Sequence, residues 1–272
     1  MSSISVHLIY FSPTGTTRTI VDRVAAELAT ADIKTYDLTL LAKAPELQIT
    51  DGVTIIGVPV YAGRVPEVCL QRMEKITAEG VPAVLIALYG NREYEDALVE
   101  LQDIAEAKGF KVIAAAAFIG EHSYSTPSQP IATGRPDDND LWKAAAFGQK
   151  IAGLLDKELV SERLPIPGDR PYKARLPRGP IAPTADPAHC TLCAACEQIC
   201  PTAAIRTMGT LMETNAVACI LCCACVKICP EHARHLDHPM VQERRRMLVA
   251  NHVSWIAAGP IGSAADWPPS RS

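Results

Sequence analysis

Long apolar segments are missing from this chain of 272 residues. The longest uninterrupted one covers about residues 112–119, far fewer than the roughly 20 residues that a membrane-spanning helix needs. No cationic stretch precedes the first apolar residues and no small-residue cleavage site follows them, so a signal peptide is not expected. These absences predict a cytoplasmic protein without a membrane partner.

An excess of one charge is also missing. The 26 lysines and arginines nearly balance the 30 aspartates and glutamates, which leaves a formal net charge of −4. Nucleic-acid-binding proteins usually carry a basic surface that neutralises phosphates. The composition therefore gives no indication of a nucleic-acid partner.

Cysteine is scarce over most of the chain. Cys69 is the only cysteine in the first 189 residues, although the chain has ten, and the other nine lie between residues 190 and 229. A secreted disulfide scaffold spreads its cysteines over a small chain. A dense group in a cytoplasmic chain indicates a metal centre instead.

In the cysteine-poor first 160 residues, apolar runs alternate with amphipathic stretches. The expected strands cover 6–11, 33–38, 53–60, 83–89 and 111–119, and the expected helices cover 20–28, 66–76, 98–105 and 141–155. Continuous apolar runs are typical of strands buried on both faces of a parallel sheet. The predicted fold class is therefore α/β, a five-stranded doubly wound parallel sheet with helices on both faces. Such sheets bind ligands at the carboxyl ends of their strands.

A loop rich in hydroxyl groups, SPTGTT at residues 12–17, follows the first expected strand. Gly15 would let the backbone approach an anion, and the helix that follows would offer its free amides. The hydroxyl donors are Ser12, Thr14, Thr16 and Thr17. The loop has no lysine, so it is not a Walker A motif, and it is not GxGxxG either. It suits a terminal phosphomonoester, and the alternative is an ordinary helix cap that contains threonines.

This loop, placed after the first strand of the alternating pattern, makes residues 4–158 resemble the flavodoxin family. That family folds as a doubly wound sheet and binds FMN, so the resemblance implies an FMN site formed by the loops. The first loop at the flavin ring would comprise Pro59, Val60, Tyr61, Ala62 and Gly63. The second would comprise Tyr89, Gly90, Asn91, Arg92 and Tyr94.

Aromatic side chains often enclose the flavin ring in this family, which makes Tyr61 and either Tyr89 or Tyr94 the candidates. The tryptophan that many flavodoxins carry in the first of these loops is absent. The alternative for the tyrosines is that they cap strand ends and pack on their neighbours. His122, after the fifth expected strand, would face the flavin, the second domain or solvent.

Residues 161–187 contain seven prolines. Proline favours an extended and stiff chain. The segment is also basic, with Arg163, Arg170, Lys173, Arg175 and Arg178. We expect a linker that lies along the first domain and limits the movement of the second.

The clustered cysteines repeat one spacing, C-x2-C-x2-C-x3-C-P. The first copy consists of Cys190, Cys193, Cys196 and Cys200. The second copy, displaced by 29 residues throughout, consists of Cys219, Cys222, Cys225 and Cys229. The repeat indicates an internal duplication with approximate two-fold symmetry. Zinc sites usually use two C-x2-C pairs that lie farther apart, so this spacing favours iron–sulfur clusters.

Residues 186–236 resemble the two-cluster bacterial ferredoxins, in which the fourth cysteine of each run ligates the other cluster. The resemblance implies two [4Fe–4S] clusters. The first would be held by Cys190, Cys193, Cys196 and Cys229. The second would be held by Cys219, Cys222, Cys225 and Cys200. Cys223 and Cys69 fall outside the spacing and are expected to be small buried residues.

The whole chain resembles the flavodoxin–ferredoxin fusions of anaerobic bacteria and archaea. The implied parts are a flavodoxin-like domain at 1–160, a linker at 161–187, a small α+β ferredoxin domain at 188–236, and a C-terminal helix with a disordered tail at 237–272. The implied function is electron transfer between the clusters and FMN. Redox proteins or a small electron acceptor would be the partners, and a homodimer is an option.

Two other functions stay open. In one, the flavin would reduce a small quinone or nitro compound with electrons from the clusters. In the other, a flavin-free first domain would serve as a docking module for a larger redox complex. No Ser/His/Asp or paired-carboxylate arrangement stands out in the sequence, so no catalytic residue is assigned.

Overall fold

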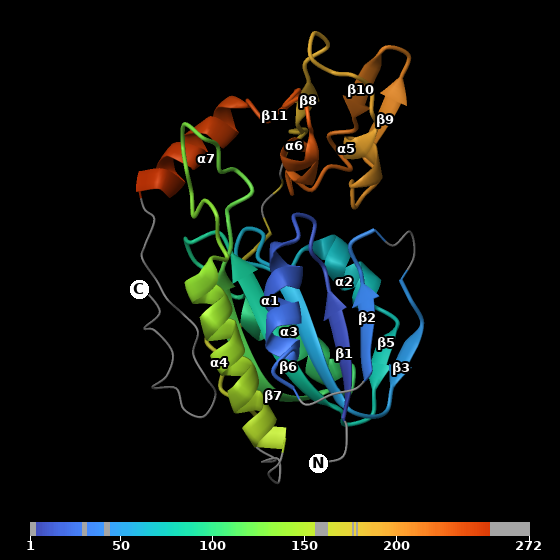
Figure 1. Cartoon of the computed structure of the whole chain (residues 1–272), viewed down its shortest axis with the longest axis vertical. Helices are drawn as coiled ribbons and strands as arrows, with labels where there is room; N and C mark the ends of the chain where they lie inside the picture. The colour runs from blue at the N-terminus through green and yellow to red at the C-terminus, as the bar shows by residue number, and fades with distance from the viewer. Residues whose placement is uncertain are drawn as a thin grey trace.

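The computed structural model describes residues 4–28, 32–40, 44–155, 163–175, 177 and 179–250. Arg178 and residues 251–272, within the expected C-terminal part at 237–272, lie outside the described residues. The described chain forms an α/β body with a smaller body above one end of its sheet (Figure 1). No described helix is both long and apolar enough to cross a membrane.

The central sheet has five parallel strands in the order β2-β1-β4-β6-β7. These strands are β1 (Ser5–Tyr10), β2 (Asp32–Asp37), β4 (Val53–Pro59), β6 (Pro82–Tyr89) and β7 (Lys111–Ile119). Numbered within the sheet alone, the order is 2-1-3-4-5, which is the flavodoxin-like doubly wound arrangement. The predicted fold class is therefore confirmed, with strand boundaries within one residue of most of the expected ones.

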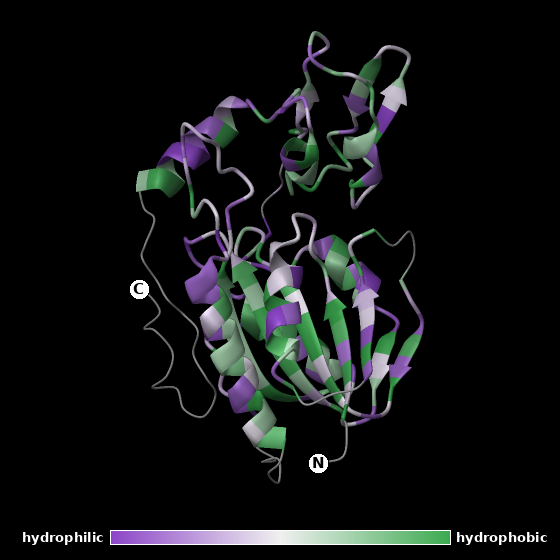
Figure 2. Cartoon of the chain, viewed as in Figure 1, coloured by the Kyte–Doolittle hydropathy of each residue, from purple (hydrophilic) through white to green (hydrophobic). Residues whose placement is uncertain are grey.

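Helices cover both faces of this sheet. Successive side chains of a strand point to opposite faces, so each strand contributes side chains to both helix layers. Leu8 and Tyr10 pack with α1 (Thr16–Ala25) and α4 (Asp138–Leu155) on one face. Ile9 and Phe11 pack with α2 (Glu67–Met73) and α3 (Ala97–Ala107) on the other. Figure 2 shows the apolar residues concentrated in the strands and the polar ones along the outward sides of the helices.

Cys69 of α2 is fully buried in the second of these apolar layers. Burial raises the pKa of its thiol to about 12. It is therefore a small core residue, as its isolation in the sequence predicts.

A second parallel pair, β3 (Leu47–Ile49) with β5 (Ile76–Ala78), stands beside the main sheet and was not predicted. Each strand has three residues. Segments this short show neither period-two alternation nor a continuous apolar run, which are the two signals that reveal a strand.

The basic, proline-rich segment lies along α3 and is held there by carboxylates. Asp103 accepts hydrogen bonds from Arg170 Nε at 2.9 Å and Arg170 Nη2 at 2.7 Å, and also from Arg163 and Tyr172. The Arg170 hydrogen bonds, followed by those of Tyr172 and Arg163, hold the pKa of Asp103 well below its usual range. Lys173 Nζ lies 2.6 Å from Glu95 Oε2. The described part of this segment is thus fastened to the α/β body.

The smaller body contains two antiparallel pairs and two short helices. The pairs are β8 (Thr184–Ala185) with β11 (Arg234–His235), and β9 (Ile205–Met208) with β10 (Leu211–Thr214). The helices are α5 (Ala195–Gln198) and α6 (Ala224–Ile228), and α7 (Pro239–Ala250) follows at the end of the described chain.

The backbone of this body repeats itself at the 29-residue interval of the cysteines. Left-handed backbone angles occur in matched pairs: Leu192 and Leu221 (φ 56° and 57°), Ala194 and Cys223 (60° and 57°), and Ala203 and His232 (50° and 49°). Side chains at such angles are strained, so their recurrence reflects a shared local fold. The structure therefore shows the internal duplication that the spacing predicts.

Candidate functional site

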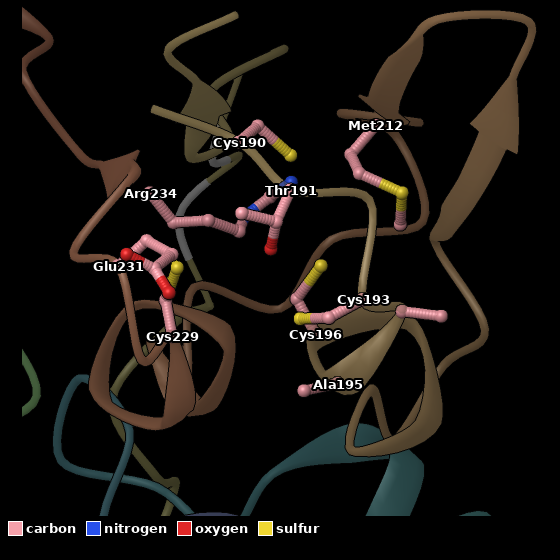
Figure 3. Close-up of a pocket in the computed structure, with 10 residues that line it drawn as sticks. Cys190, Thr191, Cys193, Ala195, Cys196, Met212, Cys229, Glu231 and Arg234 are labelled. Atoms are coloured by element: carbon pink, nitrogen blue, oxygen red, sulfur yellow. The ribbon is translucent and has the colours of Figure 1, made fainter. Parts of the chain in front are cut away.

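Four thiols from both halves of the duplication surround one pocket, here called the outer pocket. They belong to Cys190, Cys193, Cys196 and Cys229. Figure 3 shows them around a common space, with Met212, Glu231 and Arg234 among the other lining residues. Cys229 belongs to the second copy of the spacing, so this pocket combines three cysteines of one copy with the last cysteine of the other.

A second pocket, here called the inner pocket, has the reciprocal composition. Its lining includes Cys200, Cys219, Cys222 and Cys225 of the repeated spacing, and also Cys223, which falls outside that spacing. Pro183, Pro201, Ile205 and Ile220 are among its other lining residues, and none of its lining side chains is charged. The structure thus brings together the same two sets of cysteines that the ferredoxin resemblance implies.

The chemistry of these donors suits iron–sulfur clusters, which are held by cysteine thiolates. Backbone amides donate to the sulfurs, from Ala204 N to Cys200 Sγ and from Ala233 N to Cys229 Sγ, both at 3.3 Å. Such hydrogen bonds stabilise thiolates that ligate iron.

Burial alone would keep the inner thiols protonated. It raises the pKa of Cys222 to about 12 and that of Cys225 to about 11. Metal ligation requires thiolates, so binding of iron must drive their ionisation. Cys223 is buried as well, but it lies outside the four-cysteine set and packs with Ile181, Leu236 and Val241.

The hydroxyl-rich loop forms an open cradle at the start of α1. Gly15 has a φ of 83°, and a side chain there would meet nothing within 4 Å. Ser12 Oγ accepts the amide of Arg18 at 3.0 Å, and the first helical hydrogen bond runs from Thr19 N to Gly15 O at 3.1 Å. The amides of Thr16 and Thr17 precede that bond and are free for an anion.

The threonines of this loop have different surroundings. Thr14 Oγ1 and Thr16 Oγ1 lie 3.3 Å apart and are partly exposed. The side chain of Thr17 is buried, and its methyl group approaches Gly57 in β4. The open hydroxyls are therefore those of Thr14 and Thr16, whereas the Ser12 hydroxyl accepts the Arg18 amide.

The first loop at the expected ring position is a tight turn after β4, preceded by the partly exposed Pro59 and Val60. Tyr61 N donates to Arg64 O at 2.9 Å, across Ala62 (φ 53°) and Gly63 (φ 80°). Arg64 Nη2 lies 2.7 Å from Glu100 Oε1, so the turn is anchored to α3. Tyr61 itself is half-buried and remains at the surface of the turn.

The tyrosines of the second loop lie inside the core. Tyr89 and Tyr94 are 4% and 7% exposed, and their rings meet edge to face with centroids 5.8 Å apart. Burial raises the pKa of Tyr94 to about 12 and that of Tyr89 still further. Of the three candidate aromatics, Tyr61 is the one that the structure leaves accessible.

Between these tyrosines, Asn91 presents an orphaned polar atom. Its residue is 9% exposed, its φ is 59°, and its side-chain oxygen has no hydrogen-bond partner in the described part of the chain. A buried acceptor of this kind is costly unless a ligand or water satisfies it. Gly90 lies directly beneath the His122 ring, since a side chain at Gly90 would come within 2.2 Å of it. Arg92 is exposed and pairs with Glu95.

His122 stands where the loops meet the smaller body. Its Nδ1 accepts the amide of Tyr124 at 3.0 Å, which leaves the proton of the neutral ring on Nε2. Burial, reinforced by the positive charge of Lys227 and of nearby arginines, lowers the pKa of His122 to about 4. His122 is therefore a neutral hydrogen-bond donor at physiological pH.

Comparison with known protein families supports the assignment of the cysteine-rich part of the chain. Residues 183–206 match the family described as 4Fe-4S binding domain. The chain has the architecture of a flavodoxin–ferredoxin fusion. The matched residues include the first copy of the cysteine spacing, and the second copy follows from the duplication. Among curated proteins, none matches the chain.

Several solved structures are similar to the α/β part of the fusion. A flavodoxin from the domain Archaea is 13% identical, covers 57% of this chain and 100% of its own, and has a TM-score of 0.40. A Streptococcus pneumoniae flavodoxin is 14% identical, covers 55% of this chain and 98% of its own, and has a TM-score of 0.39. A Fusobacterium nucleatum flavodoxin bound to flavin mononucleotide is 17% identical, covers 55% of this chain and 98% of its own, and has a TM-score of 0.38. Similarity at this level carries no functional argument, and the fold assignment rests on the strand order.

The two bodies of the fusion meet at the carboxyl ends of the strands, on the side of the inner pocket. Arg72 of α2 is 8% exposed and donates to Leu38 O at 2.8 Å, to Thr39 O at 2.7 Å and to Pro201 O. Ile220, which lines the inner pocket, packs against the apolar layer beneath that sheet face.

Two further contacts close the other side of this junction. Lys227 Nζ lies 2.5 Å from Glu121 Oε1. Arg245 Nε donates to Tyr124 O at 2.7 Å, which joins α7 to the loop after β7 (Figure 1). No sequence motif marks Arg72, Lys227 or Arg245, because each contacts a residue far away in the chain.

Proposed function

We propose that this protein transfers electrons between two [4Fe–4S] clusters in its smaller body and an FMN at the carboxyl edge of its sheet. The observation that carries the proposal is the position of the inner four-cysteine pocket, which packs on the same sheet edge as the open phosphate cradle. When bound, the clusters supply one-electron chemistry and the flavin supplies one- or two-electron chemistry.

The proposed division of the chain follows the sequence: a flavodoxin-like domain at 1–160, a linker at 161–187, a ferredoxin domain at 188–236 and a C-terminal part at 237–272. The carboxylates of α3 that hold residues 163–175 support a linker that is part of the first domain's surface rather than a free tether. A fixed linker keeps the clusters and the sheet edge at a constant separation.

The residues at the cradle fit the polar end and the ring of an FMN. Thr14, Gly15 and Thr16 surround open space in front of unpaired amides, which suits a phosphate. Tyr61 is the half-buried aromatic residue of the first loop, and a ring N–H could donate to the Asn91 side-chain oxygen, which has no partner in the described part of the chain. Tyr89 and Tyr94 would support the second loop from the core.

Pure electron transfer is favoured over reduction of a free quinone or nitro compound. The smaller body lies over the sheet edge through Pro201 and Ile220, so a flavin there would face the inner cluster rather than open solvent. We expect a redox protein to exchange electrons with the chain.

Cofactor analysis of anaerobically purified protein tests the proposal. We expect iron and sulfide for two [4Fe–4S] clusters and one FMN per chain, with overlapping flavin and iron–sulfur absorbance. Iron and sulfide without FMN after reconstitution with excess FMN would favour the docking module instead. Iron without sulfide would contradict the cluster assignment.

Replacement of Gly15 by valine is expected to weaken FMN binding at least about tenfold, which corresponds to a loss of roughly 1.4 kcal/mol. The new side chain would project into the open space where the phosphate is expected, and the φ of 83° would be strained. FMN affinity measured by flavin fluorescence quenching checks the effect. Gly80→Val is the matched control, because Gly80 also has a positive φ (69°) and open surroundings but precedes β6, at the opposite end of the sheet. Equal affinity in the Gly15 and Gly80 variants would place the phosphate elsewhere.

A further inference from the structure

Arg234 is a buried cation with unused hydrogen-bond donors. It is 2% exposed, and its Nη2 donates to Pro183 O at 2.9 Å and to Thr214 Oγ1. Its Nε and Nη1 have no hydrogen-bond partner in the described part of the chain. A buried guanidinium without a carboxylate is costly, so the missing partner is expected to be an anionic acceptor.

The pocket next to Arg234 identifies that acceptor. Arg234 lines the outer pocket together with the four thiols (Figure 3). Its positive charge also acts on one cysteine of each pocket, Cys196 of the outer one and Cys225 of the inner one, but Arg234 lines the outer pocket and not the inner one. A ligated iron–sulfur cluster is anionic, and its sulfur atoms accept hydrogen bonds. It would therefore supply the acceptors that Nε and Nη1 of Arg234 lack in the described part of the chain.

The duplication shows that this arginine distinguishes the two pockets. Arg234 lies 29 residues after Ile205, and Ile205 lines the inner pocket. The equivalent position therefore carries a buried charge at one pocket and an apolar side chain at the other. Glu231, which also lines the outer pocket, is exposed, so water and salt screen its charge more than that of Arg234.

We propose that Arg234 donates hydrogen bonds to the outer cluster and raises its reduction potential above that of the inner cluster. Reduction adds one negative charge to a cluster, so a buried cation and N–H donors stabilise the reduced form. The inner cluster has no charged lining residue, and Arg72 donates to the Pro201 carbonyl rather than into that pocket.

This asymmetry has a functional consequence and rests on the proposed binding of two clusters. A chain that has received one electron would hold it on the outer cluster, on the side away from the sheet edge. Cys193 of that pocket is exposed, so the stored electron would be accessible to an external redox protein. The inner cluster would then connect the outer cluster with the flavin.

A potentiometric titration followed by electron paramagnetic resonance tests the proposal on the full chain. Wild-type protein is expected to show two reduction steps, the higher belonging to the outer cluster. Arg234→Met should lower the reduction equilibrium constant of the outer cluster at least about tenfold, which is roughly 59 mV for one electron. The inner step should move much less. Each titration is repeated in a Cys193→Ser background, which alters the spectrum of the outer cluster and so assigns the steps.

Three control variants separate electrostatics from packing. Ile205→Met alters the equivalent position of the other half and should leave the outer step unchanged. Thr214→Val removes a partner of Nη2 but leaves Nε and Nη1 in place, so it should also leave that step unchanged. Arg234→Lys keeps the positive charge and should preserve most of the difference in reduction potential between the two clusters. It provides a second measurement if Arg234→Met loses its clusters.

The outcomes distinguish this inference from the proposed function. Wild-type protein without two clusters would remove the basis for both. Two clusters whose potentials coincide, or respond equally to Arg234→Met, would overturn the role of Arg234 and leave electron transfer standing.

Discussion

Cys200→Ala is expected to abolish the cluster in the inner pocket and to leave the cluster beside its own sequence neighbours intact. The side chain of Cys200 lines the inner pocket with Cys219, Cys222 and Cys225, although it is nearest in sequence to the outer set. The chain turns between these sets, since α5 ends at Gln198 and the Cys200 sulfur accepts the Ala204 amide at 3.3 Å. A cluster with one thiolate missing is expected to be lost during purification, so about half of the iron and sulfide should disappear.

Two further variants, Cys229→Ala and Cys223→Ala, test whether the loss of a cluster depends on which cysteine is replaced. Cys229→Ala should remove the outer cluster and retain the inner one, because Cys229 lines the outer pocket. Cys223→Ala should keep both clusters, since Cys223 lines the inner pocket but falls outside the repeated spacing and packs with Ile181, Leu236 and Val241. Electron paramagnetic resonance and iron analysis report which cluster survives. Loss of the outer cluster alone in Cys200→Ala would show that each copy of the spacing holds its own cluster.

Much of the fold follows from local sequence signals. Strands β6 and β7 are apolar for more than five consecutive residues, and the amphipathic period of the helices is clear, whereas β2 is mostly polar and exposed. The cysteine spacing repeats without a single shift, and the paired left-handed residues show that the backbone repeats with it. Such features depend on residues close in sequence and can therefore be predicted without the structure.

Other features depend on contacts between distant residues. The sequence marks Tyr89 and Tyr94 as aromatic residues in a loop, but their burial results from packing in the apolar layer beneath that loop. Arg234 looks like a surface arginine in the sequence, and its burial appears only once β8 pairs with β11. The same holds for Arg72, whose three carbonyl partners come from two segments far from it in the chain.

Electrons are expected to pass between the clusters and the flavin within one molecule, at a rate independent of protein concentration. The inner pocket is held on the sheet edge by Arg72, by the Lys227–Glu121 pair and by Arg245. A docked arrangement of this kind replaces a bimolecular encounter by a step within the chain. Rapid reduction of the clusters by an external low-potential donor, followed by time-resolved absorbance at several protein concentrations, measures that rate.

Arg72→Met should slow this exchange strongly, because Arg72 joins α2 to Pro201, which follows Cys200 of the inner pocket. Its removal leaves buried carbonyls without a donor, at about 1–3 kcal/mol each, and opening the junction to water would relieve that cost. Arg246→Met is the matched control, because Arg246 is exposed and pairs with Glu243 of its own helix. The control should keep the wild-type rate. A wild-type rate that rises in proportion to protein concentration would mean transfer between molecules, and the junction would then serve to dock the two domains without conducting electrons between them.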